Sequence, residues 1–577
     1  MSPTSNKLWP VPPSTLADFL QKLPDIKGKQ VVVGLSAYVA YLILRRLIIW
    51  PFVLSPLRKL PGPPVGNLIL GQSRTIINSE TGIPQREWVK KYGPVVRMVG
   101  PVGVERLIFM EPEYLHQILV KDWLQYPRPE YLRNILGIVT GHGLLTVTGD
   151  EHKQMRKAMN PAFSIPNLMA QTHMYWESIE GLINIFNDQL ASVGPEGKIL
   201  HVYDWMSKVT LDIICETAFG YKADSLHNPH NELAVAYEKL IALQSGPNIA
   251  KFILVMLVPG APKLLASNWG YRNRWLFEKI NLLRAPLPSP YFYPSNILYS
   301  HVITGEVSTL IGSMYEIRKL SKKMLEDKFA ETAAQISDID AKRDIMSILV
   351  RARKAEQEGK SGEQYVMNDQ AMMDQVLTFL GAGHETTASG LTWTLWLLAN
   401  DKESQRKLRE ELAPIMTENP HPDYRTLKDL KWLDCVVMES LRVMPPVPLT
   451  IRVAKEQGIL NGMVIPKGTM FYIPIRVVNT WKVIWGEDAE EFHPERWLDL
   501  PKDYHPSFSM LSFIAGPHAC IGKTMAIIEM KAVLAGLIVN FEFDPASEGQ
   551  KAMPAAAITM KPTDGMPLRI RRIQPRA

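Results

Sequence analysis

The sequence predicts a mainly α-helical fold with small β-sheets, in a chain of 577 residues. Past residue 70, apolar residues recur with a helical period of about 3.6 residues. Strand-like pieces are few and short, as at residues 95–99 and 470–474. The chain shows neither an internal repeat nor a regular alternation of strands and helices, which excludes a doubly wound parallel sheet. No linker divides the body, so we expect one large domain.

The amino-acid composition excludes several classes of protein. Hydrophobic residues make up 46% and charged residues 21% of the chain, so it can bury a large core and is not disordered. Its three cysteines, Cys215, Cys435 and Cys520, are far apart and form no CxxC pair, which excludes a disulfide framework or a zinc knuckle. The net charge of +6 is mildly basic and scattered, so we expect no nucleic-acid binding. Such a charge suits an acidic protein partner or an anionic membrane surface.

The first 54 residues divide into an N-terminal segment, 1–30, and a predicted membrane anchor, 31–54. Residues 31–44 carry no charge, but a helix needs about 20 residues to cross a bilayer. The anchor is long enough only if Arg45 and Arg46 reach lipid headgroups while residues 47–54 lie in the interface. A cleaved signal sequence is the alternative, but no small-residue cleavage site follows cleanly. Basic residues after the anchor place the following domain in the cytosol.

Residues 55–66 are rich in proline and are interpreted as a stiff hinge between the anchor and the body. We expect residues 67–577 to form the functional domain. Within it, residues 282–307 break the helical pattern because they are rich in Pro, Ser and Tyr and almost uncharged. A structureless stretch of this length is unusual in a compact domain, so this segment is either an atypical loop, an insertion or an artefact of the gene model.

Residues 369–400 are predicted to form one long helix with Gly381 and Gly383 near its centre. Each glycine lowers the stability of the helix by about 1 kcal/mol relative to alanine, so the presence of two glycines needs an explanation. Glycines beside a hydroxyl residue such as Thr386 can open a bulge where a small ligand and water lie. An ordinary core helix is the alternative. A zinc-protease HExxH motif is excluded because Ala388 stands where the second histidine is needed.

Glu439 and Arg442 stand three residues apart, on one face of a predicted helix. The same spacing occurs at residues 130–133 and 403–406, so it identifies nothing by itself. The pair at 439–442 is selected by its position, because it lies between the glycine-containing helix and a cysteine segment and is followed by Arg496 in a Pro-Glu-Arg-Trp sequence.

Cys520 directly precedes a predicted helix over residues 523–540. The positive potential of a helix start is expected to lower the thiol pKa toward the thiolate, which is the form that binds iron. Gly516 and Gly522 would let the backbone approach a flat cofactor. A phosphate-binding P-loop is excluded because five residues separate these glycines where that motif has four. A buried structural cysteine is the remaining alternative, and is the role expected for Cys215 and Cys435.

The segment from Phe513 to Gly522 resembles the haem-ligand loop of the cytochrome P450 monooxygenases, F-x-x-G-x-R/H-x-C-x-G, with His518 where arginine is commoner. Residues 382–387 are similar to the family's A/G-G-x-D/E-T-T/S motif. Residues 439–442 and 494–497 resemble its E-x-x-R and P-E-R-F motifs, with Trp497 in place of Phe. The likeness covers nearly the whole chain after Pro61. It implies the cytochrome P450 fold of a eukaryotic, membrane-anchored and fungal member.

The resemblance also implies roles for individual residues. Cys520 is the axial ligand of haem b, iron protoporphyrin IX, in a loop formed with Phe513, Gly516, His518 and Gly522. Thr386 bonds bound dioxygen and Glu385 carries protons. Glu439, Arg442 and Arg496 form a structural network under the cysteine loop. The haem propionates are bound by His152, which replaces the family's tryptophan, and by Arg156, Arg452 and His518.

The implied activity is monooxygenation, in which one atom of O2 enters a bulky hydrophobic substrate such as a terpenoid, steroid or polycyclic aromatic, in secondary metabolism or xenobiotic oxidation. The sequence has no flavin or dinucleotide fingerprint, so electrons are expected to come from another protein. The resemblance implies that this donor is NADPH–cytochrome P450 reductase, with cytochrome b5 as a second donor. The implied location is the endoplasmic reticulum membrane, with a single-pass anchor and a cytosolic domain. The expected substrate pocket comprises residues 126–145 and 242–265, Phe379 and Ala382.

Two other functions stay open. The first is a haem-thiolate isomerase or lyase acting on peroxides. Such an enzyme needs no proton relay, so the presence of Glu385 and Thr386 argues against it. The second is a membrane-bound haem sensor without turnover.

Overall fold

The computed structural model describes residues 28–243, 260–265, 267–279, 306–334, 343–357, 366–555 and 558–573. Residues 282–305 of the atypical segment and most of the expected pocket region 242–265 lie outside the described residues. The described chain is mainly helical with three small sheets, which confirms the predicted fold class.

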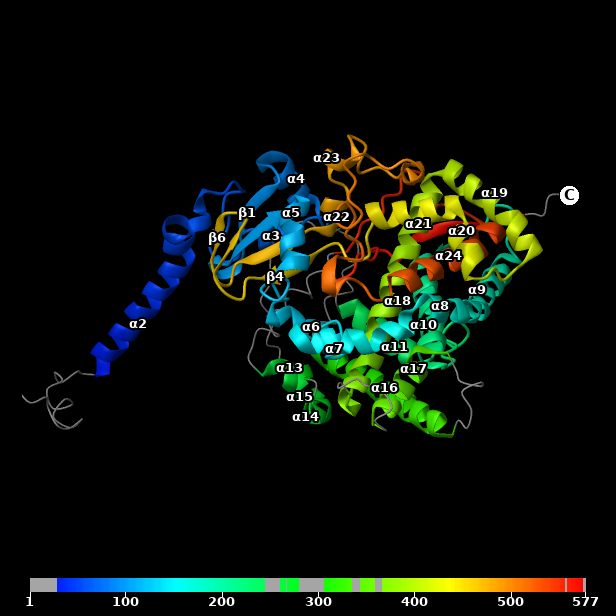
Figure 1. The fold of residues 1–577 in the computed structure, drawn as a ribbon, viewed down its shortest axis with the longest axis horizontal. Coiled ribbons are helices and arrows are strands. Elements are labelled where there is room, and N and C mark those ends of the chain that lie inside the picture. Colours follow the sequence, from blue (N-terminus) through cyan, green and yellow to red (C-terminus); the bar gives the residue numbers. More distant parts are fainter. Residues whose placement is uncertain are drawn as a thin grey trace, which may run out of the picture.

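The molecule has two parts with separate hydrophobic cores (Figure 1). Next to the anchor lies a sheet-rich part, whose core includes Leu107, Phe109 and Phe471. The larger part is helical, and helix α18 (Asp369–Asn400) runs through it with its middle almost wholly buried. The cysteine loop is packed between the two cores, because Ala515 belongs to the first and Met525 to the second.

The main sheet has the strand order β1-β2-β7-β4. β2 pairs with β7 in parallel, while the β1–β2 and β4–β7 pairs are antiparallel. An antiparallel sheet has the order β3-β9-β8, and β5 and β6 form a hairpin whose turn holds Asn461 and Gly462 at positive φ, as such short turns require. The strands are β1 Val95–Val99, β2 Glu105–Phe109, β3 Lys198–His201, β4 Thr450–Val453, β5 Gly458–Leu460, β6 Met463–Ile465, β7 Met470–Ile473, β8 Phe541–Pro545 and β9 Pro567–Arg572.

The long helices match the sequence periodicity, and the predicted helices at 369–400 and 523–540 are confirmed. Asn368 caps α18 by accepting a hydrogen bond from the Ala371 N–H, which explains why the helix starts there. The α-helices are α2 Gly28–Leu44, α3 Ser73–Ile77, α4 Ile83–Tyr92, α5 Pro112–His116, α6 Glu130–Thr140, α7 Gly149–Met159, α8 Ile165–Gln171, α9 Tyr175–Leu190, α10 Val202–Phe219, α11 Glu232–Leu243, α13 Ala261–Leu265, α14 Asn268–Arg272, α15 Arg274–Lys279, α16 Glu306–Ala334, α17 Ile345–Gln357, α18, α19 Lys402–Glu418, α20 Tyr424–Asp429, α21 Lys431–Val443, α22 Ile475–Asn479, α23 Lys482–Trp485 and α24 Lys523–Asn540.

The N-terminal helix projects away from the body (Figure 1). Its apolar stretch, Val31–Leu54, is the one helix in the described part of the chain that is long and apolar enough to cross a membrane. Its second half is the π-helix η1 (Arg45–Leu54), which packs on the short helix η3 (Pro101–Gly103). Gly103 has φ +66° and lies so close to the Arg46 carbonyl that a Cβ would come within 2.3 Å of that oxygen. Arg46, which we expect to reach lipid headgroups, donates from Nε to the Val102 carbonyl at the exposed surface.

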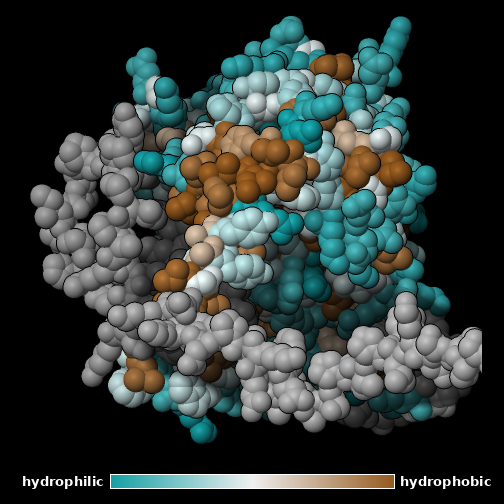
Figure 2. Space-filling view, turned by 90° about the vertical axis from the view of Figure 1, so that its left-hand side faces the viewer, coloured by the Kyte–Doolittle hydropathy of each residue, from teal (hydrophilic) through white to brown (hydrophobic). Residues whose placement is uncertain are grey.

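A buried carboxylate holds the end of the anchor on the sheet. Glu105 of β2 accepts hydrogen bonds from the Trp50 indole at 3.0 Å and the Ser55 hydroxyl at 2.7 Å, and it pairs with Arg97 at 2.8 Å. The proline-rich segment then runs beside β1, where the Arg97 N–H donates to the Pro61 carbonyl. Exposed apolar side chains, among them Ile69 and Val102, continue from the anchor onto the domain, and Figure 2 shows hydrophobic residues gathered on this face.

Candidate functional site

The loop that carries Cys520 lies directly before α24. It is closed by a hydrogen bond from the Cys520 N–H to the Phe513 carbonyl, 2.9 Å. Gly516 has φ +77°, and a Cβ there would lie 2.2 Å from the Leu119 carbonyl oxygen, so no other residue fits without displacing the backbone. Ile514 also has a positive φ of 52°, a strained conformation for a β-branched residue. The surrounding structure therefore holds this loop in one shape.

Cys520 differs from the other two cysteines. Cys215 and Cys435 are buried, as expected for structural residues. Cys520 is solvent-accessible, although many protein atoms lie around its thiol and desolvate it. Burial raises the pKa of the Cys520 thiol, while the Gly522 N–H, Arg156 and Lys523 act in the opposite direction. The expectation that the helix start alone lowers this pKa is therefore wrong, because desolvation outweighs the local positive potential. A bound metal ion deprotonates a thiol outright, so iron ligation remains compatible with this site.

Basic side chains converge beside the cysteine loop. The rings of His152 and His518 lie 3.9 Å apart between centroids, and Trp123 packs edge-on against both. Arg128 Nη1 lies 3.4 Å from His518 Nδ1. Arg156 donates to the Ala519 carbonyl at 2.5 Å. Arg452 of β4 is 2% exposed, and its positive charge is repelled by that of Arg128. The structure thus brings the four sequence-predicted cofactor-binding bases together, and adds Arg128 and Trp123.

This group of bases has no compensating carboxylate within the described residues. Burial, followed by neighbouring arginines, lowers the pKa of His152 to about 4 and holds that of His518 far below its ordinary value. Burial likewise lowers the pKa of Arg128 to about 10 and of Arg452 well below its usual range. Such mutual repulsion is relieved by an anion, and a ligand with two carboxylates would supply it.

Two polar atoms of this group are buried without a hydrogen-bond partner, His152 Nδ1 and Arg452 Nη2. Buried donors of this kind normally have a partner, so they point to a ligand that accepts hydrogen bonds. The propionates of haem fit this requirement, and Cys520 next to them fits the iron. On this observation the residues present can hold haem b.

We expect replacement of Arg452 by methionine to weaken haem retention. A hydrogen bond to a charged group contributes about 1.5–3 kcal/mol, so the rate of haem transfer to apomyoglobin should rise by roughly tenfold to a hundredfold. The haem-transfer rate of Arg452→Lys should lie between those of Arg452→Met and the parent, because lysine keeps the charge but lacks the planar guanidinium fork. The exposed Arg74 offers the matched control, and Arg74→Met should transfer haem at the parent rate. Equal rates for Arg452→Met and Arg74→Met would contradict the propionate role.

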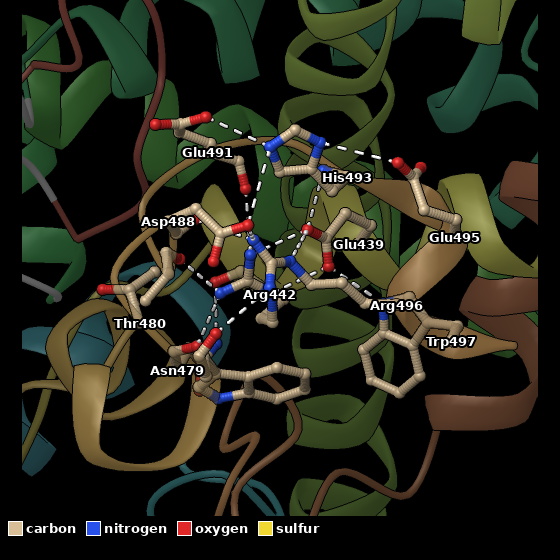
Figure 3. A network of polar contacts seen from close by, with 12 residues as sticks. Glu439, Arg442, Asn479, Thr480, Asp488, Glu491, His493, Glu495, Arg496 and Trp497 are labelled. Atoms are coloured by element: carbon tan, nitrogen blue, oxygen red, sulfur yellow. Dashed lines mark hydrogen bonds and ion pairs between the residues drawn. The ribbon is translucent and has the colours of Figure 1, made fainter. Parts of the chain in front are cut away.

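Glu439 and Arg442 of α21 form a buried ion pair (Figure 3). Both side chains are fully buried, and two parallel bonds of 2.7 Å join them. Arg442 also donates to the backbone carbonyls of residues 479, 489 and 491. Glu439 accepts from the His493 N–H at 2.9 Å and the Trp497 indole at 3.0 Å, and Arg496 lies 3.5 Å away. Glu439 and Arg442 therefore compensate each other's charge, and together with Arg496 they tie α21 to the segment 479–497.

Asn479 connects this network to the cysteine loop and was not foreseen from the sequence. Its amide donates to the Arg442 carbonyl at 3.2 Å and to the Ser512 hydroxyl at 2.8 Å. Its oxygen accepts from the Leu511 N–H at 2.7 Å. Since the loop begins at Phe513, these bonds fix the backbone immediately before it. An asparagine that ends a short helix gives no sequence signal for this role.

Glu385 and Thr386 lie in the middle of α18. The Thr386 hydroxyl donates to the Ala382 carbonyl at 2.8 Å, while its side chain is half-buried. Glu385 is buried and accepts a hydrogen bond of 2.5 Å from the Thr559 hydroxyl. Burial raises the pKa of the Glu385 carboxyl, and the Thr559 bond and Lys561 oppose the rise. A buried carboxyl whose pKa is raised in this way is a candidate proton donor and acceptor.

The walls beside this helix are apolar. α6 packs on α18 through Thr140, whose methyl group would lie 3.0 Å from a Cβ at Gly381, and buries Ile135 and Ile138. Ala382 is half-buried. Phe379, expected to line the pocket, packs against Phe163 at 5.7 Å between ring centroids.

Comparison with known proteins gives concordant matches along most of the chain. A family profile described as Cytochrome P450 matches residues 56–269 and 291–568. Cytochrome P450 monooxygenase 205 of Postia placenta is 33% identical over 528 residues, which cover 88% of this chain and 90% of the relative. Cytochrome P450 monooxygenase sphH of Aspergillus fumigatus is 30% identical, covering 91% and 90%. A ganoderic acid synthetase of Ganoderma lucidum is 28% identical, covering 90% and 93%.

Proposed function

Since the chain belongs to the cytochrome P450 family and its relatives are fungal monooxygenases, we propose that it oxidises a bulky hydrophobic substrate, such as a terpenoid, a steroid or a polycyclic aromatic. Membership makes haem b its cofactor, and O2 and an organic molecule its substrates. Thiolate-ligated haem supplies an oxidant able to attack unactivated C–H bonds. We place the reaction in secondary metabolism or xenobiotic oxidation.

One observation carries the proposal beyond family membership. Glu385, whose carboxyl is buried and hydrogen-bonded to Thr559, directly precedes Thr386 in the middle of α18. Oxygen activation requires protons delivered to a site from which bulk water is excluded. In this proposal Glu385 holds and releases the proton, Thr386 passes it on, and the apolar residues of α6 keep water and polar molecules out. A haem sensor would need no such acid.

The remaining chain residues hold the cofactor in place. Cys520 binds the iron, and His152, Arg156, Arg452 and His518 bind the propionates, with Arg128 as a fifth group. Glu439, Arg442 and Arg496 keep the cysteine loop in position through Asn479.

Electrons are proposed to come from NADPH–cytochrome P450 reductase, with cytochrome b5 as a second donor. Three exposed lysines, Lys153, Lys157 and Lys523, stand on α7 and α24, the two helices next to the cysteine loop, and suit an acidic partner. The apolar helix at residues 31–54 supports attachment to the endoplasmic reticulum membrane, with the domain in the cytosol. Reductase-dependent O2 consumption, measured against a panel of such substrates, tests the activity and identifies the substrate class.

We expect Thr386→Ala to uncouple O2 consumption from product formation. Without the hydroxyl, protons are no longer delivered in order, so product formed per NADPH should fall roughly tenfold while hydrogen peroxide rises. Thr392→Ala is the matched control, because Thr392 lies on the same helix and makes the same kind of bond, to the Ala388 carbonyl. The control should couple like the parent. Unchanged coupling in Thr386→Ala would overturn the relay.

A further inference from the structure

A loop near the C-terminus is fastened to the middle of α18. The Met560 N–H donates to the Pro446 carbonyl at 2.7 Å, and the Ala555 N–H donates to the Lys561 carbonyl at 2.7 Å. The Met560 carbonyl accepts from the Ser389 hydroxyl at 2.8 Å and also from the Trp393 indole. Met560 itself is fully buried. The backbone on either side of Met560 is therefore held in register with α18.

This attachment places two polar side chains on Glu385. Thr559 is 4% exposed and donates its hydroxyl to Glu385 Oε1 at 2.5 Å. Lys561, two residues further on, is also buried and interacts electrostatically with the Glu385 carboxyl. The Thr559 hydrogen bond is made to Oε1, so it fixes the orientation of the carboxyl group.

We propose that Thr559 and Lys561 are positioning residues that hold the Glu385 carboxyl in the orientation from which it delivers protons to Thr386. This inference rests on the proposed proton relay and extends it to a segment 174 residues away in sequence. The C-terminal loop thereby sets both the orientation and the pKa of the Glu385 carboxyl on α18.

Titratable groups of α10, α11 and the C-terminal loop interact with Glu385, and His384 is its neighbour in the sequence of α18. Tyr203 of α10 and Tyr237 of α11 are buried, and their hydroxyls have no hydrogen-bond partner among the described residues. His384, on α18 itself, is buried and bonds the Leu380 carbonyl through Nδ1. Lys561 is the cation among the groups that perturb the Glu385 pKa. Removing the Thr559 bond or the Lys561 charge should therefore raise the pKa of Glu385 further and move its ionisation to higher pH.

The test compares Thr559→Val and Lys561→Met with Glu385→Gln and the double variant Glu385→Gln/Thr559→Val in the full-length holoenzyme. Thr559→Val should lower product per NADPH severalfold and shift the pH profile of coupling to higher pH, and Thr559→Ser should restore both. The double variant should couple no worse than Glu385→Gln alone, because the two residues act as a unit. Thr563→Val and Lys551→Met change exposed residues of the same segment and should match the parent.

Thermal unfolding gives a second readout that does not depend on turnover. A carboxyl whose folded-state pKa is raised lowers stability progressively as pH rises from its unfolded-state value toward its folded-state value. The melting temperature of Thr559→Val should therefore fall more steeply over this pH range than that of the parent, and Glu385→Gln should remove the extra slope.

The outcomes distinguish the positioning role of Thr559 and Lys561 from the proton relay itself. If Glu385→Gln uncouples the enzyme but Thr559→Val and Lys561→Met behave like their controls, the positioning role is overturned and the proposed relay stands. If Glu385→Gln itself leaves coupling unchanged, both are overturned. Additive losses in the double variant would also overturn the positioning role.

Discussion

Replacing Cys520 with serine is expected to abolish product formation while part of the haem stays bound. Serine has nearly the same size, but its oxygen cannot donate electron density to iron as a thiolate does, and that donation is what favours O–O cleavage. The bases around His152 and Arg452 do not depend on the cysteine and should still bind the propionates. Reductase-supported turnover and haem content by the pyridine haemochrome spectrum measure the two effects separately.

Cys435→Ser is the matched control for this substitution. Cys435 is buried in α21, where burial raises the pKa of its thiol to about 11, so it acts as a small apolar residue. The control should keep turnover within a fewfold of the parent. Loss of activity in both variants alike, or retained activity in Cys520→Ser, would contradict the assignment of Cys520 as the iron ligand.

Replacing Arg442 with methionine is expected to prevent formation of a stable holoenzyme. The change leaves the Glu439 carboxylate fully buried beside unpaired carbonyls, and breaking a buried ion pair in this way costs about 3–5 kcal/mol. The whole domain is stabilised by about 5–15 kcal/mol, so this loss removes a large share of its stability. Yield of soluble, haem-containing protein and the midpoint of urea unfolding are the measurements.

Arg406→Met provides a control with the same local sequence pattern. Arg406 pairs with Glu403 three residues earlier, as Arg442 does with Glu439, but both side chains are more than half exposed. An exposed pair contributes about 0.2–1 kcal/mol, so this variant should unfold close to the parent midpoint. Similar losses in Arg406→Met and Arg442→Met would show that burial is not the reason for the role of Arg442.

The parts of this fold that could be predicted from sequence are those encoded locally. Helix α18 matches its predicted range because its apolar period is long and Asn368 caps its start. Helix α24 begins directly after Gly522, and β1 matches residues 95–99. The spacing of Glu439 and Arg442 also identified a pair, although only its position among other motifs distinguished it from the exposed pair at residues 403–406.

Features created by tertiary contact could not be predicted. Arg128 stands between two prolines, and nothing in its neighbourhood indicates that it meets His518, which lies 390 residues later. Asn479 gives no signal either, because its bonds to Leu511 and Ser512 depend on how α22 packs against the cysteine loop. The pKa of Cys520 was expected in the wrong direction because the local effect of a helix start can be deduced from sequence, whereas burial depends on the whole fold.

The central claim is that the sulfur of Cys520 is the proximal ligand of a haem iron, and the ultraviolet–visible spectrum of the reduced protein under carbon monoxide tests it most directly. Full-length protein purified with haem should show the red-shifted Soret band that thiolate ligation produces. Haem-loaded protein, reconstituted with hemin if necessary, whose Soret band stays at the position of a histidine-ligated or ligand-free haem would contradict it.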